Sequence, residues 1–268
     1  MKLPEIPKIL EKLGICKSRS SFVSEDLQKT LHKNLEFTAI EQYKLLRANL
    51  KFTLPEGVKC PTIGVTSSMR GEGKSTTAIN LSYVLAESGS RVLLIDADLR
   101  IPSVAKKMDL PSSPGLTDFL MGNATTLASC KSPVLDTWYI MPAGDIPPNP
   151  SELLGSKRMQ SLLEKLRERF DYIVVDLPPV NMVSDAISIA GLITGMLVVV
   201  REEYTEKKEL ERCLRQLRLS NVKVLGCLMN ETKSGGGTYA KYKKNKHYKY
   251  YRYYQSEETP TPTQGAES

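Results

Sequence analysis

The sequence predicts an α/β fold in which a doubly wound, mostly parallel sheet carries helices on both faces. Two observations support this prediction. Short apolar runs typical of buried parallel strands alternate along the chain with amphipathic stretches of helical period. Such alternation builds successive strand–helix–strand units, which form a parallel sheet. The length of 268 residues suffices for one sizeable domain with appendages, and is short for two full domains.

The expected elements follow from the same patterns, taken in chain order. Strands are predicted in the run that opens at Thr62 and at residues 91–96, 138–141, 172–175, 196–200 and 222–229. Helices are predicted from Thr38 to about Leu50, from just after Ser75 to a stop at Gly89, and at 156–170 and 205–219. Thr38 and Glu41 have the spacing of a capping box at the first of these helices. Residues 102–150 are rich in proline, so short helices and loops are expected there.

The domain organisation predicted from these elements has three parts. Residues 1–36 form an N-terminal extension, interpreted as a frayed terminus or as a docking helix for a partner. Residues 37–231 form the folded domain. Residues 232–268 form a flexible C-terminal tail that begins with a glycine-rich joint at 234–237.

Composition limits the possible environments of the protein. The net charge of +7 is concentrated in the tail, where residues 239–254 hold six Lys and Arg and no acidic residue. Five cysteines are scattered without metal-ligand spacing, which indicates reduced thiols in a cytosolic protein. The N-terminus has no signal-peptide core, and the longest apolar run, at 191–200, is too short to cross a bilayer. We therefore expect any membrane association to come through a surface or a partner.

A phosphate-binding loop, or Walker A motif, is predicted between the first strand and the helix that follows. Residues 62–77 read TIGVTSSMRGEGKSTT, an arrangement in which loop N–H groups and a helix N-terminus cradle phosphate oxygens. Lys74 is expected to reach the β- and γ-phosphates and the Ser75 hydroxyl to bind Mg²⁺. Ser68 stands where the full pattern has glycine. The predicted nucleotide contacts in the loop are Gly71, Glu72, Gly73, Lys74, Ser75 and Thr76.

Three aspartates are expected at the same edge of the sheet. Asp96, Asp98 and Asp176 each follow a hydrophobic strand, and the carboxyl ends of parallel strands face the ligand crevice. Mg²⁺ prefers hard oxygen ligands and usually keeps several waters, so one or two of these carboxylates with Ser75 would suffice. Phosphoryl transfer also needs a group that accepts the nucleophile's proton, and a second aspartate supplies one. Aspartate also follows strands because it turns chains, but three such residues beside a phosphate-binding loop favour the functional interpretation.

With these motifs, the chain resembles the bacterial tyrosine kinases (BY-kinases), the autokinases of capsule and exopolysaccharide synthesis. The resemblance covers about residues 36–231. It rests on the phosphate-binding loop and on the stretches LLIDADLR (93–100), GLTDFL (115–120), MPAG (141–144), PPNPSELL (147–154), VVDLPP (174–179) and VSDA (183–186). It implies a P-loop NTPase fold of the MinD/ParA type with Walker A, A′ and B motifs, and ATP and Mg²⁺ as cofactors.

The resemblance also implies roles for individual residues. Asp96 corresponds to the catalytic base, acting with Lys74 and Asp98. Ser75, Asp98 and Asp176 correspond to the Mg²⁺ ligands, with Asp176 as the Walker B carboxylate. Asn230 is similar to the adenine-contacting position of the family.

An oligomerisation helix is implied by the spacing of Glu41, Lys44 and Arg47, where the family has Glu-x-x-Arg-x-x-Arg. Taken alone, such a stripe is most often a solvated helix face with pairs three residues apart, and the resemblance favours the interface instead. Lys44 keeps the charge of the arginine it replaces but lacks the planar fork, so weaker ring assembly is expected. The resemblance further implies a transmembrane activator similar to polysaccharide co-polymerases, a cognate tyrosine phosphatase, and a cytoplasmic location at the inner membrane face.

The tail contains a cluster of seven of the twelve tyrosines, interleaved with lysine. The resemblance makes them the sites of autophosphorylation: Tyr239, Tyr242, Tyr248, Tyr250, Tyr251, Tyr253 and Tyr254. By composition alone, such a tail could instead stack on single-stranded nucleic acid or remain a solvated appendage. We expect a kinase substrate and no nucleic-acid partner.

Two alternative functions remain open at this stage. A MinD/ParA-like ATPase, acting as a switch on membranes or DNA, resembles this fold but carries a signature lysine early in the loop, where this chain has Met69. A regulator that senses ATP without an enzymatic reaction is the other alternative.

Overall fold

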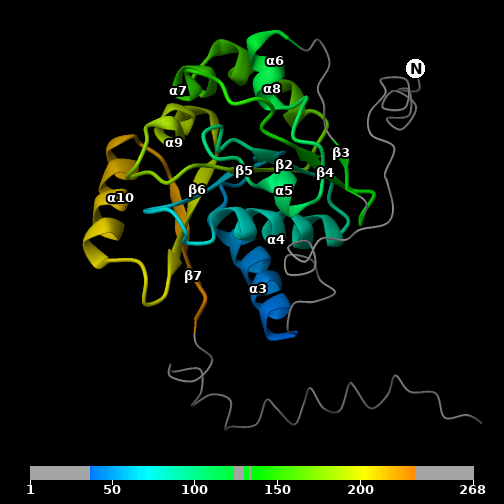
Figure 1. Ribbon diagram of the computed structural model, residues 1–268. Helices are drawn as coiled ribbons and strands as arrows, with labels where there is room; N and C mark the ends of the chain where they lie inside the picture. Colours follow the sequence, from blue (N-terminus) through cyan, green and yellow to red (C-terminus); the bar gives the residue numbers. More distant parts are fainter. Residues whose placement is uncertain (1–36, 124–129, 133, 233–268) are drawn as a thin grey trace, which may run out of the picture. The chain divides into compact units, whose positions relative to one another are not determined.

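The computed structural model describes residues 37–123, 130–132 and 134–232 (Figure 1). The expected N-terminal extension and the tyrosine cluster of the tail lie outside the described residues. Within the described ranges the strands form one seven-stranded sheet with the order β3-β4-β2-β5-β1-β6-β7. The strands are β1 (Thr62–Ser67), β2 (Val92–Asp96), β3 (Cys130–Lys131), β4 (Trp138–Met141), β5 (Tyr172–Asp176), β6 (Gly195–Arg201) and β7 (Val224–Asn230).

The sheet confirms the predicted fold class. Every pairing between β4, β2, β5, β1, β6 and β7 is parallel, and β1 lies between β5 and β6. The chain passes from β1 to β2 on one side and later to β6 on the other, so the strand order reverses at β1. Ligands of open α/β sheets bind at such a reversal, outside the carboxyl ends of the strands. The two-residue strand β3 pairs antiparallel with β4 and was not predicted, because it is too short to show an apolar pattern.

Helices cover both faces of the sheet (Figure 1). The helices are α3 (Phe37–Thr53), α4 (Lys74–Glu87), α5 (Val104–Lys107), α6 (Leu116–Met121), α7 (Pro150–Leu154), α8 (Lys157–Arg167), α9 (Asp185–Ser188) and α10 (Lys207–Leu219), with a 3₁₀ turn, η1 (Ala190–Leu192). The first three share one hydrophobic cluster with the sheet, and α6 to α10 share the other.

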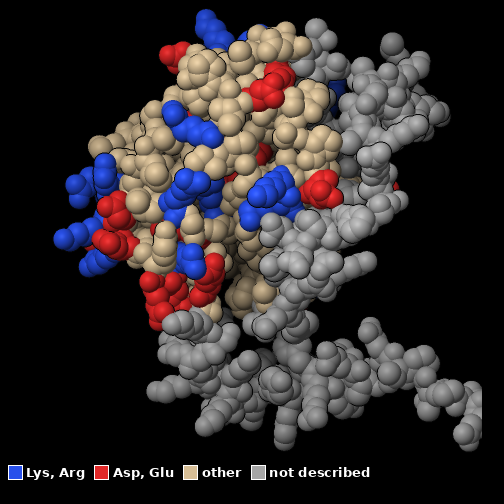
Figure 2. All heavy atoms as spheres, in the orientation of Figure 1, with Lys and Arg blue, Asp and Glu red and all other residues tan. Residues whose placement is uncertain are grey.

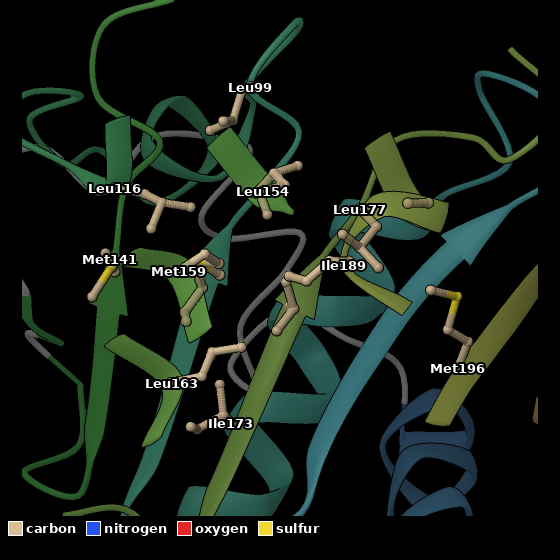
Figure 3. Packing of buried hydrophobic residues seen from close by; sticks show 14 of the residues in the cluster. Leu99, Leu116, Met141, Leu154, Met159, Leu163, Ile173, Leu177, Ile189 and Met196 are labelled. Carbon is tan, nitrogen blue, oxygen red and sulfur yellow. The ribbon is translucent and has the colours of Figure 1, made fainter. Parts of the chain in front are cut away.

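Strand β2 shows why both faces must be covered. Successive side chains of a strand point to opposite faces. Leu93 and Ile95 belong to the cluster under α8, whereas Val92 and Leu94 belong to the cluster under α4. All four are fully buried. Figure 3 shows the cluster under α8, in which side chains of α8 pack onto the sheet. The continuous apolar run that predicted a buried strand is therefore required by two cores.

The helix boundaries correct one prediction and support others. Helix α3 begins at Phe37, so Thr38 lies inside the helix and the predicted capping box is wrong. The expected stop after α4 is present, because Gly89 has a left-handed φ of 91° that favours glycine. Ser156 caps α8 by accepting a hydrogen bond from the Met159 N–H at 3.2 Å.

Helix α10 is amphipathic. Its inner side buries Cys213 and Leu217, and its outer side carries an exposed pair between Lys207 and Glu211 at 3.8 Å. Figure 2 shows basic and acidic side chains interspersed over this part of the surface. No helix among the described residues combines the length and the apolar content that crossing a bilayer requires.

Candidate active site

The phosphate-binding loop connects the carboxyl end of β1 with the first residue of α4, as predicted. Gly71 and Gly73 have left-handed φ angles of 83° and 94°, a conformation that side chains other than glycine rarely adopt. A Cβ atom at Gly73 would also lie 2.0 Å from the Asn230 Nδ2 atom. Both glycines are therefore required by backbone conformation, and Gly73 by space as well. Alternation of left-handed and ordinary residues is typical of anion-binding nests.

Ser68, the departure from the usual glycine, has a structural role in the loop. Its hydroxyl donates a hydrogen bond of 2.8 Å to Oε1 of Glu72, and the Met69 N–H donates one of 2.8 Å to Oε2. Glu72 is fully buried, and Thr205 from the β6–α10 loop also donates to its carboxylate. A buried carboxylate is costly unless it is hydrogen-bonded. Ser68 thus supplies a donor to Glu72 that glycine could not.

Lys74 brings the predicted metal ligands together. Its Nζ atom lies 2.7 Å from Oδ2 of Asp98, 3.9 Å from Oδ1 of Asp176 and 3.4 Å from Oγ of Ser75. Burial alone would lower the pKa of Lys74, but the carboxylates of Asp176 and Asp98 outweigh it and raise the pKa above its ordinary value. An ammonium group therefore stands among the three side chains that the sequence assigned to Mg²⁺.

Asp176 is a buried carboxylate with unsatisfied oxygens. Both oxygens are inaccessible to solvent and have no hydrogen-bond partner among the described residues. Burial raises the pKa of Asp176, and the positive charge of Lys74, 3.9 Å from Oδ1, offsets part of that increase. A buried carboxylate that accepts no hydrogen bond is unfavourable unless a cation neutralises it. These observations fit a divalent cation at this position.

The protein provides few metal ligands of its own. The described residues contain no cluster of three or more His, Cys, Asp or Glu with metal-binding geometry. Mg²⁺ often binds through one or two carboxylates and completes its shell with waters and substrate phosphates. Ser75, Asp98 and Asp176 fit that pattern, because they leave several positions for phosphate oxygens and water.

Asp96 lies deeper than Asp98. It is fully buried, and its Oδ2 accepts hydrogen bonds from the N–H groups of Ser103 and Val104 at 3.1 and 3.0 Å. Its Oδ1 accepts a longer bond of 3.3 Å from the Asp98 N–H. Burial, followed by the charge of Asp176, raises the pKa of Asp96 to about 7, although the Val104 N–H and Lys74 oppose the shift. Asp96 can therefore exist both as the neutral acid and as the carboxylate near neutral pH.

The segment after β2, which carries Asp98 and Arg100, is anchored by a cluster that sequence reasoning did not assemble. Arg100 forms a bidentate pair with Asp185, with Nε–Oδ2 and Nη2–Oδ1 distances of 2.8 and 3.0 Å. Ser151 also donates to this carboxylate, which is fully buried. The three residues come from three of the separate stretches quoted above. One residue of each stretch therefore helps to hold the segment after β2 in place.

Three residues contact the phosphate-binding loop from the other side, and two of them, Arg201 and Tyr204, were missed by sequence reasoning. Arg201 and Tyr204 lie in the loop after β6 and hydrogen-bond the loop backbone. Asn230, at the end of β7, donates to the carbonyl of Glu72 at 3.0 Å. Asn230 was predicted near adenine, and the structure places it against the phosphate-binding loop. No motif pointed to Arg201 or Tyr204, which are about 130 positions from the residues they contact.

The proposed oligomerisation residues lie on α3. Lys44 pairs with Glu41 at 3.0 Å, and both side chains are partly exposed. Arg47 instead donates from Nη1 to the Val84 carbonyl at 2.6 Å, which ties α3 to α4. Arg47 therefore has a role within the chain, in addition to any role between subunits. The phosphoacceptor tyrosines lie outside the described residues.

A cavity of about 600 Å³ lies beside the start of β1 and belongs to a different region. It is lined by Val58, Lys59, Cys60, Arg167, Glu168 and Thr194. The phosphate-binding loop follows the other end of β1, so this cavity is not part of the site. Burial raises the pKa of the Cys60 thiol to about 11, which makes it an inert thiol.

Comparisons with known proteins agree with this geometry. A family model described as an AAA domain matches residues 61–223. The tyrosine-protein kinase YwqD of Bacillus subtilis is 36% identical over 193 residues, which cover 72% of this chain and 81% of that protein. The tyrosine-protein kinase ptk of Acinetobacter johnsonii is 35% identical over 207 residues, 77% of this chain. The chain spans only 28% of the length of that second relative.

A solved structure shows the same relationship. The kinase domain of the Escherichia coli tyrosine kinase ETK is 28% identical and superposes with a TM-score of 0.69, covering 87% of this chain and 97% of that one. The residues that the family model matches include the phosphate-binding loop and the three aspartates. The chain belongs to the family of bacterial tyrosine-protein kinases.

Proposed function

We propose that the protein is an ATP-dependent tyrosine autokinase that phosphorylates the tyrosine cluster of its own tail. The observation that carries the proposal is the meeting of Lys74, Ser75, Asp98 and Asp176 at the carboxyl ends of β1, β2 and β5. These strands come from separate parts of the sequence, and their ends supply each group that phosphoryl transfer needs. The family to which the chain belongs supports the same function.

ATP would lie along the carboxyl edge of the sheet. The N–H groups of the loop and of the α4 N-terminus would bind its phosphates, and Lys74 would turn from Asp98 toward the β- and γ-phosphate oxygens. Asn230 lies on the β7 side of the loop, whereas Asp96 and Asp98 lie on the β2 side. This order supports an orientation with adenine toward β7 and the γ-phosphate toward β2.

Mg²⁺ would be held by Ser75, Asp98 and Asp176. When bound, the ion would supply positive charge to the phosphate oxygens as the phosphoryl group is transferred. The unsatisfied oxygens of Asp176 support its assignment as a ligand or as a neighbour of the bound waters. Asp98, which is 5% exposed, is the more accessible of the two carboxylates.

Asp96 would accept the proton of the attacking tyrosine hydroxyl. A general base works best when its pKa lies near the operating pH, and burial raises the pKa of Asp96 to about 7. Hydrogen bonds from Ser103 and Val104 fix its carboxylate, so it approaches the acceptor in one orientation. Lys74 would stabilise the charge on the transferred phosphoryl group.

The tail is the proposed acceptor because it directly follows β7, the strand that ends beside the phosphate-binding loop. Asn230 is the last residue of β7 and contacts the phosphate-binding loop, so the chain leaves the domain beside the site. The tail then carries seven tyrosines among six Lys and Arg, and this positive charge suits a site lined by carboxylates. We propose that transfer occurs between subunits of a homo-oligomeric ring, with Glu41, Lys44 and Arg47 at the interface.

The proposed setting is the inner face of the cell membrane, in the control of capsular or exopolysaccharide synthesis and export. There a transmembrane activator similar to polysaccharide co-polymerases would stimulate the kinase, and a cognate tyrosine phosphatase would reverse the modification. No nucleic-acid partner is expected.

The decisive experiment is incubation of the full chain with ATP labelled at the γ-phosphate and with Mg²⁺, followed by phosphoamino-acid analysis. Label on tyrosine supports the proposal. Release of free phosphate without labelled tyrosine would identify an ATPase switch instead. Neither product, with nucleotide binding retained, would identify a regulator that senses ATP. The Lys74→Met variant is the control for contaminating kinases.

A further inference from the structure

Three successive carbonyl groups of the phosphate-binding loop accept hydrogen bonds from side chains outside the loop. The Tyr204 hydroxyl donates to the Arg70 carbonyl at 3.1 Å, and Nη1 of Arg201 donates to the Gly71 carbonyl at 3.1 Å. Nδ2 of Asn230 donates to the Glu72 carbonyl at 3.0 Å. All three donors lie on the β6 and β7 side, opposite the catalytic carboxylates.

The geometry of the peptide bond gives these contacts a consequence. In a trans peptide the carbonyl of one residue and the N–H of the next lie in one plane and point in opposite directions. Fixing the carbonyls of Arg70, Gly71 and Glu72 therefore also fixes the N–H groups of Gly71, Glu72 and Gly73, which point away from the donors. These are N–H groups that a phosphate-binding nest presents to its anion.

The donors are themselves held in place. The Arg201 guanidinium stacks on the Tyr204 ring, with its central carbon 4.9 Å from the ring centroid. The Thr205 hydroxyl accepts a hydrogen bond of 2.9 Å from the Arg201 N–H and donates to Glu72 of the phosphate-binding loop. The ring of Tyr204 also lies over Gly71, where an added Cβ would be 3.3 Å from the hydroxyl oxygen. The β6–α10 loop and the phosphate-binding loop are thus linked residue by residue.

We infer that Tyr204 is a positioning residue, which sets the direction of the phosphate-binding N–H groups by holding the Arg70 carbonyl, together with Arg201 and Asn230. Tyr204 does not contact the reacting atoms. It acts through the peptide that joins Arg70 to Gly71, in a loop whose two left-handed glycines otherwise permit other orientations. The inference rests on the proposed binding of nucleotide at this loop.

The test is the Tyr204→Phe variant of the full chain, which loses the hydroxyl and keeps the ring that stacks with Arg201. One lost hydrogen bond should weaken ADP binding about 3- to 10-fold. The KM for ATP should rise by a similar factor, whereas kcat at saturating ATP should not change. Binding of adenosine, which has no phosphate, should also stay unchanged. Tyr172→Phe is the matched control, because Tyr172 begins β5 at the opposite end of the sheet.

The results separate this inference from the proposed function. Tyr204→Phe that binds ADP as tightly as the wild type would overturn the positioning role. Equal weakening of ADP and adenosine would also overturn it, because a general structural change would then be responsible. Wild-type protein that does not bind ADP would overturn the proposed function and the inference with it. Wild-type protein that binds ADP normally but does not phosphorylate tyrosine would contradict only the proposed kinase activity. The comparison of Tyr204→Phe with Tyr172→Phe would then still decide whether Tyr204 positions the loop.

Discussion

Replacement of Asp96 by asparagine should change how the stability of the domain depends on pH. Burial raises the pKa of Asp96 to about 7, well above the ordinary value of an aspartate. The folded protein therefore binds a proton more tightly than the unfolded chain between about pH 4 and 7. The stability contributed by this proton is fully present below about pH 4, the pKa of the unfolded chain, and it is lost as the pH rises through about 7.

The magnitude follows from the position of that pKa. Between pH 5.5 and 8.5, a group that titrates near 7 when folded and near 4 when unfolded should reduce the free energy of unfolding by about 2 kcal/mol. The asparagine side chain that replaces Asp96 does not titrate, so this loss should disappear in the variant. The hydrogen bonds that asparagine cannot reproduce with Ser103 and Val104 cost the same at each pH and cancel in the comparison.

Urea unfolding of both proteins at pH 5.5, 7 and 8.5, without added nucleotide or Mg²⁺, measures the effect. Relative to wild type, Asp96→Asn should gain about 2 kcal/mol in unfolding free energy between the two extreme pH values. Asp136→Asn, which changes a residue of the loop before β4, controls for a general loss of negative charge. Parallel pH profiles for the wild type and Asp96→Asn would refute the assignment of a raised pKa to Asp96.

The remaining predictions concern the site and the assembly. Lys74→Met should abolish phosphorylation without unfolding the domain, as circular dichroism would verify; retained phosphotyrosine would refute the loop assignment. The same variant should bind Mn²⁺ without nucleotide more tightly than wild type, because the ammonium no longer occupies the carboxylates, and unchanged binding by electron paramagnetic resonance would contradict this. Asp98→Ala should raise the Mg²⁺ concentration needed for half-maximal activity; an unchanged Mg²⁺ dependence would remove Asp98 from the metal ligands. Glu41→Ala with Lys44→Ala should reduce the oligomer mass in light scattering while leaving the Arg47 contact to α4 intact; an identical mass would return this stripe to a solvated face.

The strands and the meeting of the aspartates could be predicted because both depend on local patterns and one rule of sheet geometry. An apolar run buried on both faces is visible in the sequence of β2, and parallel strands end at the same edge. Asp98 and Asp176 therefore had to lie near Lys74, and the structure places them within 4 Å. The roles assigned to these carboxylates remain proposals.

The contacts that were missed depend on packing between distant segments. Nothing local to Tyr204 indicates that its hydroxyl reaches Arg70, and nothing local to Arg47 indicates its bond to the Val84 carbonyl. Strand β3 was missed for a different reason, since two residues cannot display a period. The incorrect cap at Thr38 shows that a short motif does not fix a helix boundary when the preceding residue can also be helical.

The most direct test of the account separates the kinase from its acceptor. One protein carries an intact site and phenylalanine at the seven tail tyrosines, and the other carries Lys74→Met and an intact tail. After incubation of the mixture with ATP and Mg²⁺, mass spectrometry should find phosphotyrosine within residues 239–254 of the Lys74→Met chain, and none when that chain is incubated alone. Consumption of ATP by the first protein without phosphotyrosine on the second would contradict the proposed kinase and its transfer between subunits.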